Sequence, residues 1–170
     1  MNDRNLFKAK RLDDGEWVQG YLCPPTYPGF IGTHWHIAEE IDSKFGINGK
    51  TWIYETINLS TIGQSTGLRD STKWEDLSSQ EQRVFTHSLP SKHQDNPQEH
   101  WEGKLMFEGD VVKTKDGLVG SIQWQVNYWK IDLSSTINKT RYIKHDSLGY
   151  HLVDLEIIGN IHDKTDSKLV

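Results

Sequence analysis

Hydrophobic and polar residues alternate in short runs along most of the chain, a pattern typical of strands with one buried face. Phe7–Lys10 alternates apolar and charged side chains, Asp13–Gly15 offers a turn, and Trp17–Leu22 begins an apolar-rich run. We therefore predict a hairpin at this end of the chain. The same period of two from Phe30 to Ile37 predicts another strand, which Ala38–Ile41 either ends or follows as a short turn.

A second hairpin is indicated by an Asn-Gly pair, which favours the tight turns that join antiparallel strands. The pair is Asn48-Gly49, and Thr51–Ile57 is the returning strand that we predict. Further along, Gly63–Asp70 is punctuated by glycines, and we interpret it as a turn.

A polar stretch from Ser71 to about Leu105 differs from the rest of the chain and has the character of an insertion. Within it, Ser78–Glu81 fits a capping box, in which the serine accepts a hydrogen bond from the third helical amide and the glutamate reaches back. We predict a helix of about two turns over Glu81–His87, because a capping box marks a helix start. Ser88–His100 has the composition of turns and loops.

Strand patterns return after a Gly-Asp turn at Glu108–Asp110. The predicted strands are Asp110–Thr114, Leu118–Trp124, Val126–Ile131 and Leu152–Ile158, with a turn at Asp116-Gly117 and a polar link over Asp132–Arg141. We predict a mainly β (α+β) fold of antiparallel hairpins with a C-terminal SH3-like partial barrel and one short helical insertion. It forms a single domain over residues 1–170, with an insertion at 71–105 and a polar tail at 164–170.

Composition narrows the class of protein. The chain has 170 residues, a formal charge of −5 and a single cysteine, Cys23, so an internal disulfide and a cysteine-based zinc cluster are excluded. The acidic balance argues against a surface that is entirely a phosphate-binding footprint. Because no apolar segment follows the N-terminus and no window approaches the length of a membrane span, we expect a soluble, cytoplasmic protein.

Three segments together resemble the YopX family, small proteins met mainly in phages and prophages of Gram-positive bacteria. Gly63–Asp70 matches the family's Gly-Gln-Tyr-Thr-Gly-Leu-Lys-Asp with Ser65 and Arg69 as departures, and Glu108–Val112 matches its Glu-Gly-Asp-Ile-Val. Glu156–His162 matches the motif near the family's C-terminus, and the start of the chain also looks like the family's start. The stretch from Ser71 to about Leu105 is the main departure, because typical members have only a tight linker there.

The resemblance implies a fold and a phage or prophage origin, and it brings no catalytic residue because the family has no established activity. The matching residues, which we expect to be structural, are Gly63, Gln64, Thr66, Gly67, Leu68, Asp70, Glu108, Gly109, Asp110, Val111, Ile158, Gly159, Asn160 and Ile161.

Two groups of side chains could hold a metal ion. His34 and His36 are spaced to share one divalent metal if Glu39, His100 or His151 supplies a further ligand; otherwise they are two histidines on a strand face. Glu102, Glu108 and Asp110 could hold Mg²⁺ or act as acid and base, but an Asp at such a turn commonly caps backbone amides instead. We predict the structural alternative for both groups, and no cofactor.

Nucleic-acid binding is a second hypothesis. Lys8, Lys10 and Arg11 form a basic edge, and Trp17, Trp35, Trp124 and Trp129 could include exposed stacking faces. Basic residues on strand edges also protect against edge pairing, and tryptophans in small β folds are mostly core.

The sequence contains no recognisable nucleophile elbow, P-loop or dinucleotide-binding motif, and Cys23 lies beside two prolines with no local base. We therefore predict a non-catalytic phage or prophage accessory protein that works by binding a protein partner or a second copy of itself. The alternatives are a nucleic-acid-binding module and, behind it, a metal-dependent enzyme centred on His34 and His36.

Overall fold

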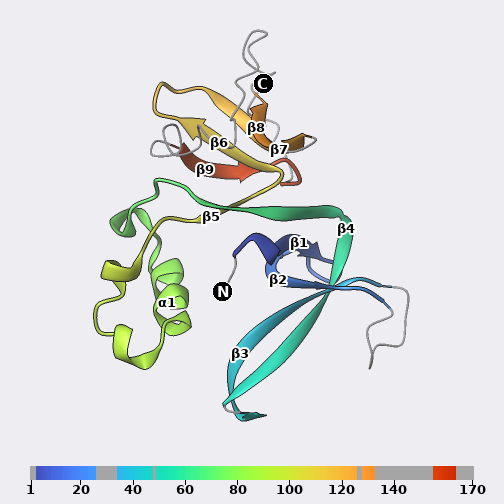
Figure 1. Ribbon diagram of the computed structural model, residues 1–170, viewed down its shortest axis with the longest axis vertical. Helices are drawn as coiled ribbons and strands as arrows, with labels where there is room; N and C mark the ends of the chain where they lie inside the picture. The colour runs from blue at the N-terminus through green and yellow to red at the C-terminus, as the bar shows by residue number, and fades with distance from the viewer. Residues whose placement is uncertain (1–2, 26–33, 48, 126–127, 133–154, 164–170) are drawn as a thin grey trace. The chain divides into compact units, whose positions relative to one another are not determined.

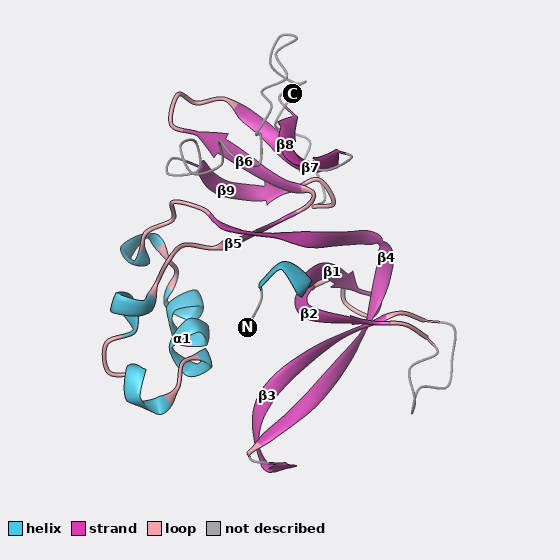
Figure 2. Cartoon of the chain, in the orientation of Figure 1, coloured by secondary structure: helices cyan, strands magenta, loops and turns pink. Residues whose placement is uncertain are grey.

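The computed structural model describes residues 3–25, 34–47, 49–125, 128–132 and 155–163. Within these ranges the protein is mainly β, with antiparallel sheets and one α-helix (Figures 1 and 2). The predicted mainly β (α+β) fold class is thereby confirmed. The sheet that closes in part is the N-terminal one, whereas the described C-terminal strands, which were predicted to form the partial barrel, lie in the linear order β8-β7-β6-β9. The chain divides into two compact units, Met1–Gly67 and Leu68–Val170, which are described separately below.

The first unit begins with a turn of 3-10 helix, η1 (Asp3–Asn5), followed by four strands. They are β1 (Phe7–Arg11), β2 (Trp17–Cys23), β3 (His36–Ile47) and β4 (Lys50–Arg69), whose last two residues belong to the second unit. Each strand pairs antiparallel with the next, and β1 also pairs with β4, so the sheet curls into a partly closed barrel. Ala9, Ile37 and Ile57 form its buried core.

Both hairpins predicted in this unit are confirmed. Phe7 lies opposite Gly20 in the first, and β3 and β4 form the second around Gly49, whose φ of 75° suits the turn. The strand predicted over Phe30–Ile37 is found only at its end, since residues 30–33 lie outside the described ranges and β3 begins at His36.

Two expectations about this unit are wrong. Ala38–Ile41 neither ends β3 nor turns, because each of these residues pairs with a residue of β4. Gly63–Arg69 is the end of β4 and not a turn, because β1 supplies a ladder partner that glycine spacing cannot reveal: Lys8 lies opposite Gly63 and Phe7 opposite Gln64. Within Gly63–Arg69, the positive φ that is typical of turns is found only at Gly67, where it is 74°.

The second unit contains the predicted helix and a separate sheet. The capping box of Ser78 and Glu81 is present, and α1 runs over Ser79–Ser88, slightly longer than predicted. Short 3-10 turns, η2 (Trp74–Asp76), η3 (Ser91–His93) and η4 (Pro97–His100), occupy the rest of the insertion. Trp74, Phe85 and Trp101 pack edge to face at its centre.

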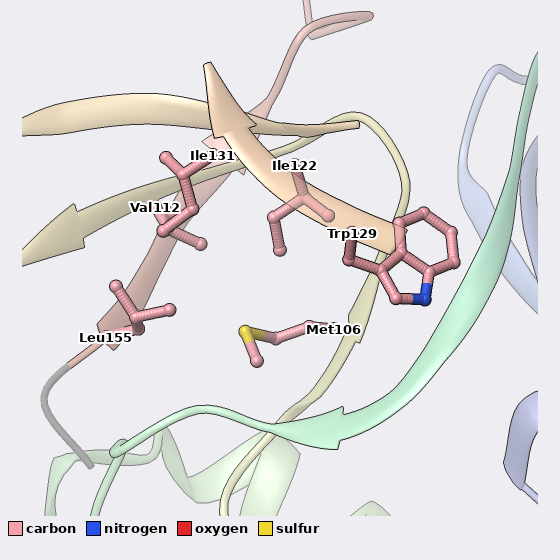
Figure 3. Close-up of a cluster of buried hydrophobic side chains, with 6 residues drawn as sticks. All are labelled: Met106, Val112, Ile122, Trp129, Ile131 and Leu155. Carbon is pink, nitrogen blue, oxygen red and sulfur yellow. The ribbon is translucent and has the colours of Figure 1, made fainter. Parts of the chain in front are cut away.

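The C-terminal strands form a four-stranded antiparallel sheet in the order β8-β7-β6-β9. Its members are β6 (Asp110–Thr114), β7 (Val119–Gln125), β8 (Tyr128–Asp132) and β9 (Leu155–Asn160), and β5 (Leu105–Phe107) precedes them. All four strands of this sheet were predicted. The parts of those predictions at residues 126–127 and 152–154, the predicted polar link beyond Asp132 and the predicted tail at 164–170 lie outside the described ranges. Figure 3 shows the buried cluster of Met106, Val112, Ile122, Trp129, Ile131 and Leu155.

Among the described residues, α1 and the shorter helical turns lack the length and apolarity needed to cross a membrane.

Candidate functional site

Asp70, the last residue of the first sequence motif, is a buried hydrogen-bond acceptor in the second unit. Its Oδ1 accepts from the backbone amides of Lys104 at 2.7 Å and Thr72 at 3.1 Å. Its Oδ2 accepts from the Thr72 hydroxyl at 2.6 Å and from the amide of Ile157 at 3.1 Å. One carboxylate therefore joins the start of the insertion, its end and strand β9.

Asp110 and Asn160 join the second and third motifs in the same way. Asp110 is fully buried; its Oδ2 accepts from the Phe107 amide at 2.8 Å and its Oδ1 from the Asn160 side-chain amide at 3.0 Å. Gly109 donates to the carbonyl of Ile122 and accepts from the amide of Ile161. The acidic residue at this Gly-Asp turn thus satisfies backbone and amide donors within the fold.

The other motif residues are divided between the two units. In the first, Gly63 and Gln64 pair with β1, and Thr66 is buried. In the second, Leu68 packs on the buried cluster and Val111 pairs with Gly159, whereas Ile158 and Ile161 are exposed.

The predicted metal groups do not assemble in the described residues. His34 precedes β3, and His36 Nδ1 lies 3.2 Å from the hydroxyl of Thr56. Glu102 lies 3.5 Å from the Arg69 guanidinium, and Glu108 accepts from the amide of Trp124. No group of three potential ligands comes together within the described ranges, and His151 lies outside them.

The basic residues of β1 are only partly brought together with aromatic rings. The prediction that they lie on a strand edge is wrong, because β1 pairs with β2 on one side and with β4 on the other. The ammonium groups of Lys8 and Lys10 lie 4.7 and 5.1 Å from the centre of the Trp17 ring. Arg11 instead contacts Asp13, Asp14 and Glu55, and its hydrogen bond to Asp14 is the main reason that its pKa is raised.

The remaining predicted tryptophans have other surroundings. Trp35 packs against the core of the first unit. In the second unit the rings of Trp124 and Trp129 are 4.8 Å apart, and only Trp124 is exposed. Trp35 and Trp129 are therefore used mainly for packing within their own units.

A shallow hollow of about 540 Å³ lies in the second unit. It is lined by residues 70–75, Gln98 and residues 101–103. Asp70 is committed to four donors there, and the Trp101 indole donates to the carbonyl of Thr72 at 2.7 Å. The polar groups at this hollow are thus largely used by the fold itself.

The strongest candidate for a binding surface is the distal ribbon, which we define as Ala38–Ile47 of β3 and Lys50–Tyr54 of β4. Trp52, Ile53 and Tyr54 are consecutive and remain 42%, 40% and 37% exposed. Alternation in a strand puts Trp52 and Tyr54 on one face and Ile53 on the other, so both faces of the ribbon carry exposed apolar side chains. The Trp52 ring also lies edge to face with Tyr21 at 5.8 Å.

The sequence prediction missed this surface, although a signal for it was present. Three consecutive large apolar residues break the alternation expected of a strand with one buried face. The exposure itself was not predictable, because it depends on which elements cover each face.

Charge on the distal ribbon is acidic near its base. Glu39 and Glu40 are exposed on β3, and Glu39 lies opposite Ile53 of β4. Partial burial, followed by the charge of Glu55, raises the pKa of Glu39. A positive group beside Glu39 would therefore meet a carboxylate that Glu55 repels.

Comparison with known proteins adds no assignment. The chain matches no protein-family model. A search of curated proteins also found no match, so the YopX resemblance stays a prediction.

Proposed function

We propose that the chain is a non-catalytic binding module that recognises a protein partner through the distal ribbon. The single observation that carries this proposal is the exposure of Trp52, Ile53 and Tyr54 on a two-stranded part of the sheet. The further proposals that the protein comes from a phage or prophage and that it is non-catalytic rest on the sequence resemblance.

Two physical arguments support a binding role for these side chains. Large contiguous patches of exposed apolar side chains are rare on monomeric soluble proteins and mark sites of interaction. Tryptophan and tyrosine are also the residues most enriched at the energetically important centres of protein interfaces.

Site-specific photo-crosslinking tests the proposal. The full-length protein would carry p-benzoylphenylalanine in place of Ile53, and a matched protein would carry it in place of Val84. Val84 is a suitable control because it is also an exposed aliphatic residue, but lies on α1 of the insertion. Both proteins would be irradiated in lysates of Gram-positive cells, with and without nuclease.

We expect a nuclease-resistant protein adduct at position 53 that excess unlabelled protein suppresses, and no matching adduct at position 84. An adduct at position 84 alone would move the binding surface to the insertion and contradict the proposal. Adducts that disappear with nuclease would favour nucleic-acid binding, for which the lysines over Trp17 are the structural support.

A further inference from the structure

The outer edge of β3 has no strand partner over most of its length in the described chain. Its pairing with β2 ends where Tyr21 lies opposite Ala38, and from Glu39 to Asp42 its partner among the described residues is β4 alone. Beyond Asp42 the register of β3 on β4 is irregular up to Ile47. The earlier part of β2, from Trp17 to Gly20, pairs with β1 instead. Figure 2 shows β3 and β4 continuing past β1 and β2 as a two-stranded ribbon.

An edge of this kind presents backbone donors and acceptors to any added strand. Proteins commonly protect such edges with proline, a bulge or charged side chains, above all lysine. In β3 there is no proline, the irregular part lies beyond Asp42, and the lysine, Lys44, lies toward the tip. The base of this edge carries Glu39 and Glu40 instead.

The acidic residues decide between possible occupants. Three of the four residues of Glu39–Asp42 are acidic. Antiparallel pairing of this stretch with that of a second copy, in full overlap, would put Glu39 of each copy opposite Asp42 of the other, and like charges across a strand pair are destabilising.

Successive residues of a strand point to opposite faces, so a segment that alternates basic and apolar residues can place its lysines or arginines beside Glu39 or beside Glu40, but not beside both. Beside Glu39 they would offset the repulsion from Glu55 that contributes to the raised pKa of Glu39. On the opposite face, exposed Trp52 lies beside Glu40 and would favour apolar side chains at the alternate positions of the segment.

We propose that the outer edge of β3 over Glu39–Asp42 binds an extended segment of a partner protein that alternates basic and apolar residues, as an added antiparallel or parallel strand. This inference rests on the proposed function, and it specifies both the chemistry of the partner and the manner of binding. Main-chain hydrogen bonds supply affinity in strand addition, and alternate side chains supply specificity.

Binding of synthetic peptides to the full-length protein, followed by fluorescence polarisation, tests the inference. The probe is a labelled, capped peptide about six residues long, the length of an ordinary strand, that alternates valine with lysine. A matched probe replaces lysine with glutamate. Two further probes carry N-methyl groups on either the odd or the even residues, because an added strand uses the amides of only one parity to pair with the edge.

We expect the valine–lysine probe to bind and the valine–glutamate probe to bind at least about tenfold more weakly. N-methylation of one parity should weaken binding about tenfold or more, while the other parity stays within about twofold. A protein with Glu39→Gln and Glu40→Gln should lose affinity for the lysine probe. Glu75→Gln with Glu99→Gln, on exposed glutamates of the second unit, should not.

Equal loss with both N-methyl series, or no loss with either, would overturn strand addition. Concentration-dependent self-association that excludes the probe would show that the edge pairs with a second copy. If position 53 crosslinks to a partner while no probe binds, this inference fails and the proposed function stands; if position 53 yields no adduct while the probe binds, the proposed function fails.

Discussion

At the scale of single residues, the motif acids act as acceptors that hold the fold together. Asp70 bonds Lys104, which is 34 residues away, and Ile157, which is 87 residues away. Removing an acceptor from a buried site leaves its donors unpaired, which usually costs more than the net contribution of the bond. The motif is therefore explained by folding alone, without any chemistry at Asp70.

Gly103 shows how closely the ends of the insertion approach each other. Its φ is 98°, and a Cβ atom there would lie 2.0 Å from the carbonyl oxygen of Asp70. Gly117 also has a positive φ, of 82°, but a Cβ atom there would meet nothing within 4 Å. Both glycines have a positive φ, but a side chain would collide with the backbone only at Gly103.

We expect Gly117→Ala to lower the free energy of unfolding by about 1–2 kcal/mol, the cost of a left-handed backbone. Gly103→Ala should lower it by about 3 kcal/mol or more, because overpacking adds to the same strain. Urea denaturation of the two variants measures the difference. Equal losses would mean that Asp70 and Gly103 do not approach as closely as described.

Residue roles were predictable from the sequence only where the partner is local. The prediction that Asp110 caps backbone amides rests on its Gly-Asp turn, and its carboxylate does accept from Phe107, three residues earlier. The role of Asp70 was out of reach, because strand pairing and the insertion decide which distant amides arrive beside it.

At the scale of elements, α1 was predictable because its signal is local, whereas β4 was not because its partners are distant in sequence. A capping box is a local pattern, so it located the helix start within two residues. The sequence predicted a strand over Thr51–Ile57 and a turn over Gly63–Asp70, but β4 is continuous from Lys50 to Arg69 because β3 and then β1 pair with it. Tertiary pairing overrode the local glycine signal.

Glu81 links α1 to the end of the insertion and gives a titratable test of this element. Its carboxylate accepts from the Lys104 ammonium at 2.8 Å and from the Ser78 amide and hydroxyl. These bonds, with Lys104 the largest cause, lower the pKa of Glu81 to about 2. Since the pKa is depressed in the folded state, the stabilisation is present above the unfolded value of about 4.3 and is lost as pH falls toward 2.

In Lys104→Met, we expect the pKa of Glu81 to rise but to stay below its ordinary value, because the two bonds from Ser78 remain. Carboxyl carbon NMR titration measures this shift. Asp14, whose pKa is lowered to about 2 chiefly by its hydrogen bond to Arg11, provides an internal control and should not change. An unchanged pKa at Glu81 would contradict the ion pair.

At the scale of the whole molecule, the sequence predicted a single domain, whereas the chain divides into two compact units at Gly67 and Leu68. The division falls inside the motif Gly63–Asp70, within a continuous strand, and composition gives no sign of a boundary there. Unfolding experiments can show whether the two units unfold in one cooperative transition or in two.

Gly20 offers a way to perturb the first unit alone. A Cβ atom at Gly20 would lie 2.2 Å from the carbonyl oxygen of Ala38, where β2 and β3 converge. Gly20→Ala should therefore destabilise the first unit by about 1–3 kcal/mol through overpacking. Because compact units often open as separate cooperative units, we expect hydrogen exchange to accelerate at amides such as Ile57 while amides such as Val112 keep their protection. Equal acceleration at both amides would instead support the single cooperative domain that the sequence predicts, and the strand β4 would then transmit the perturbation through its continuous backbone.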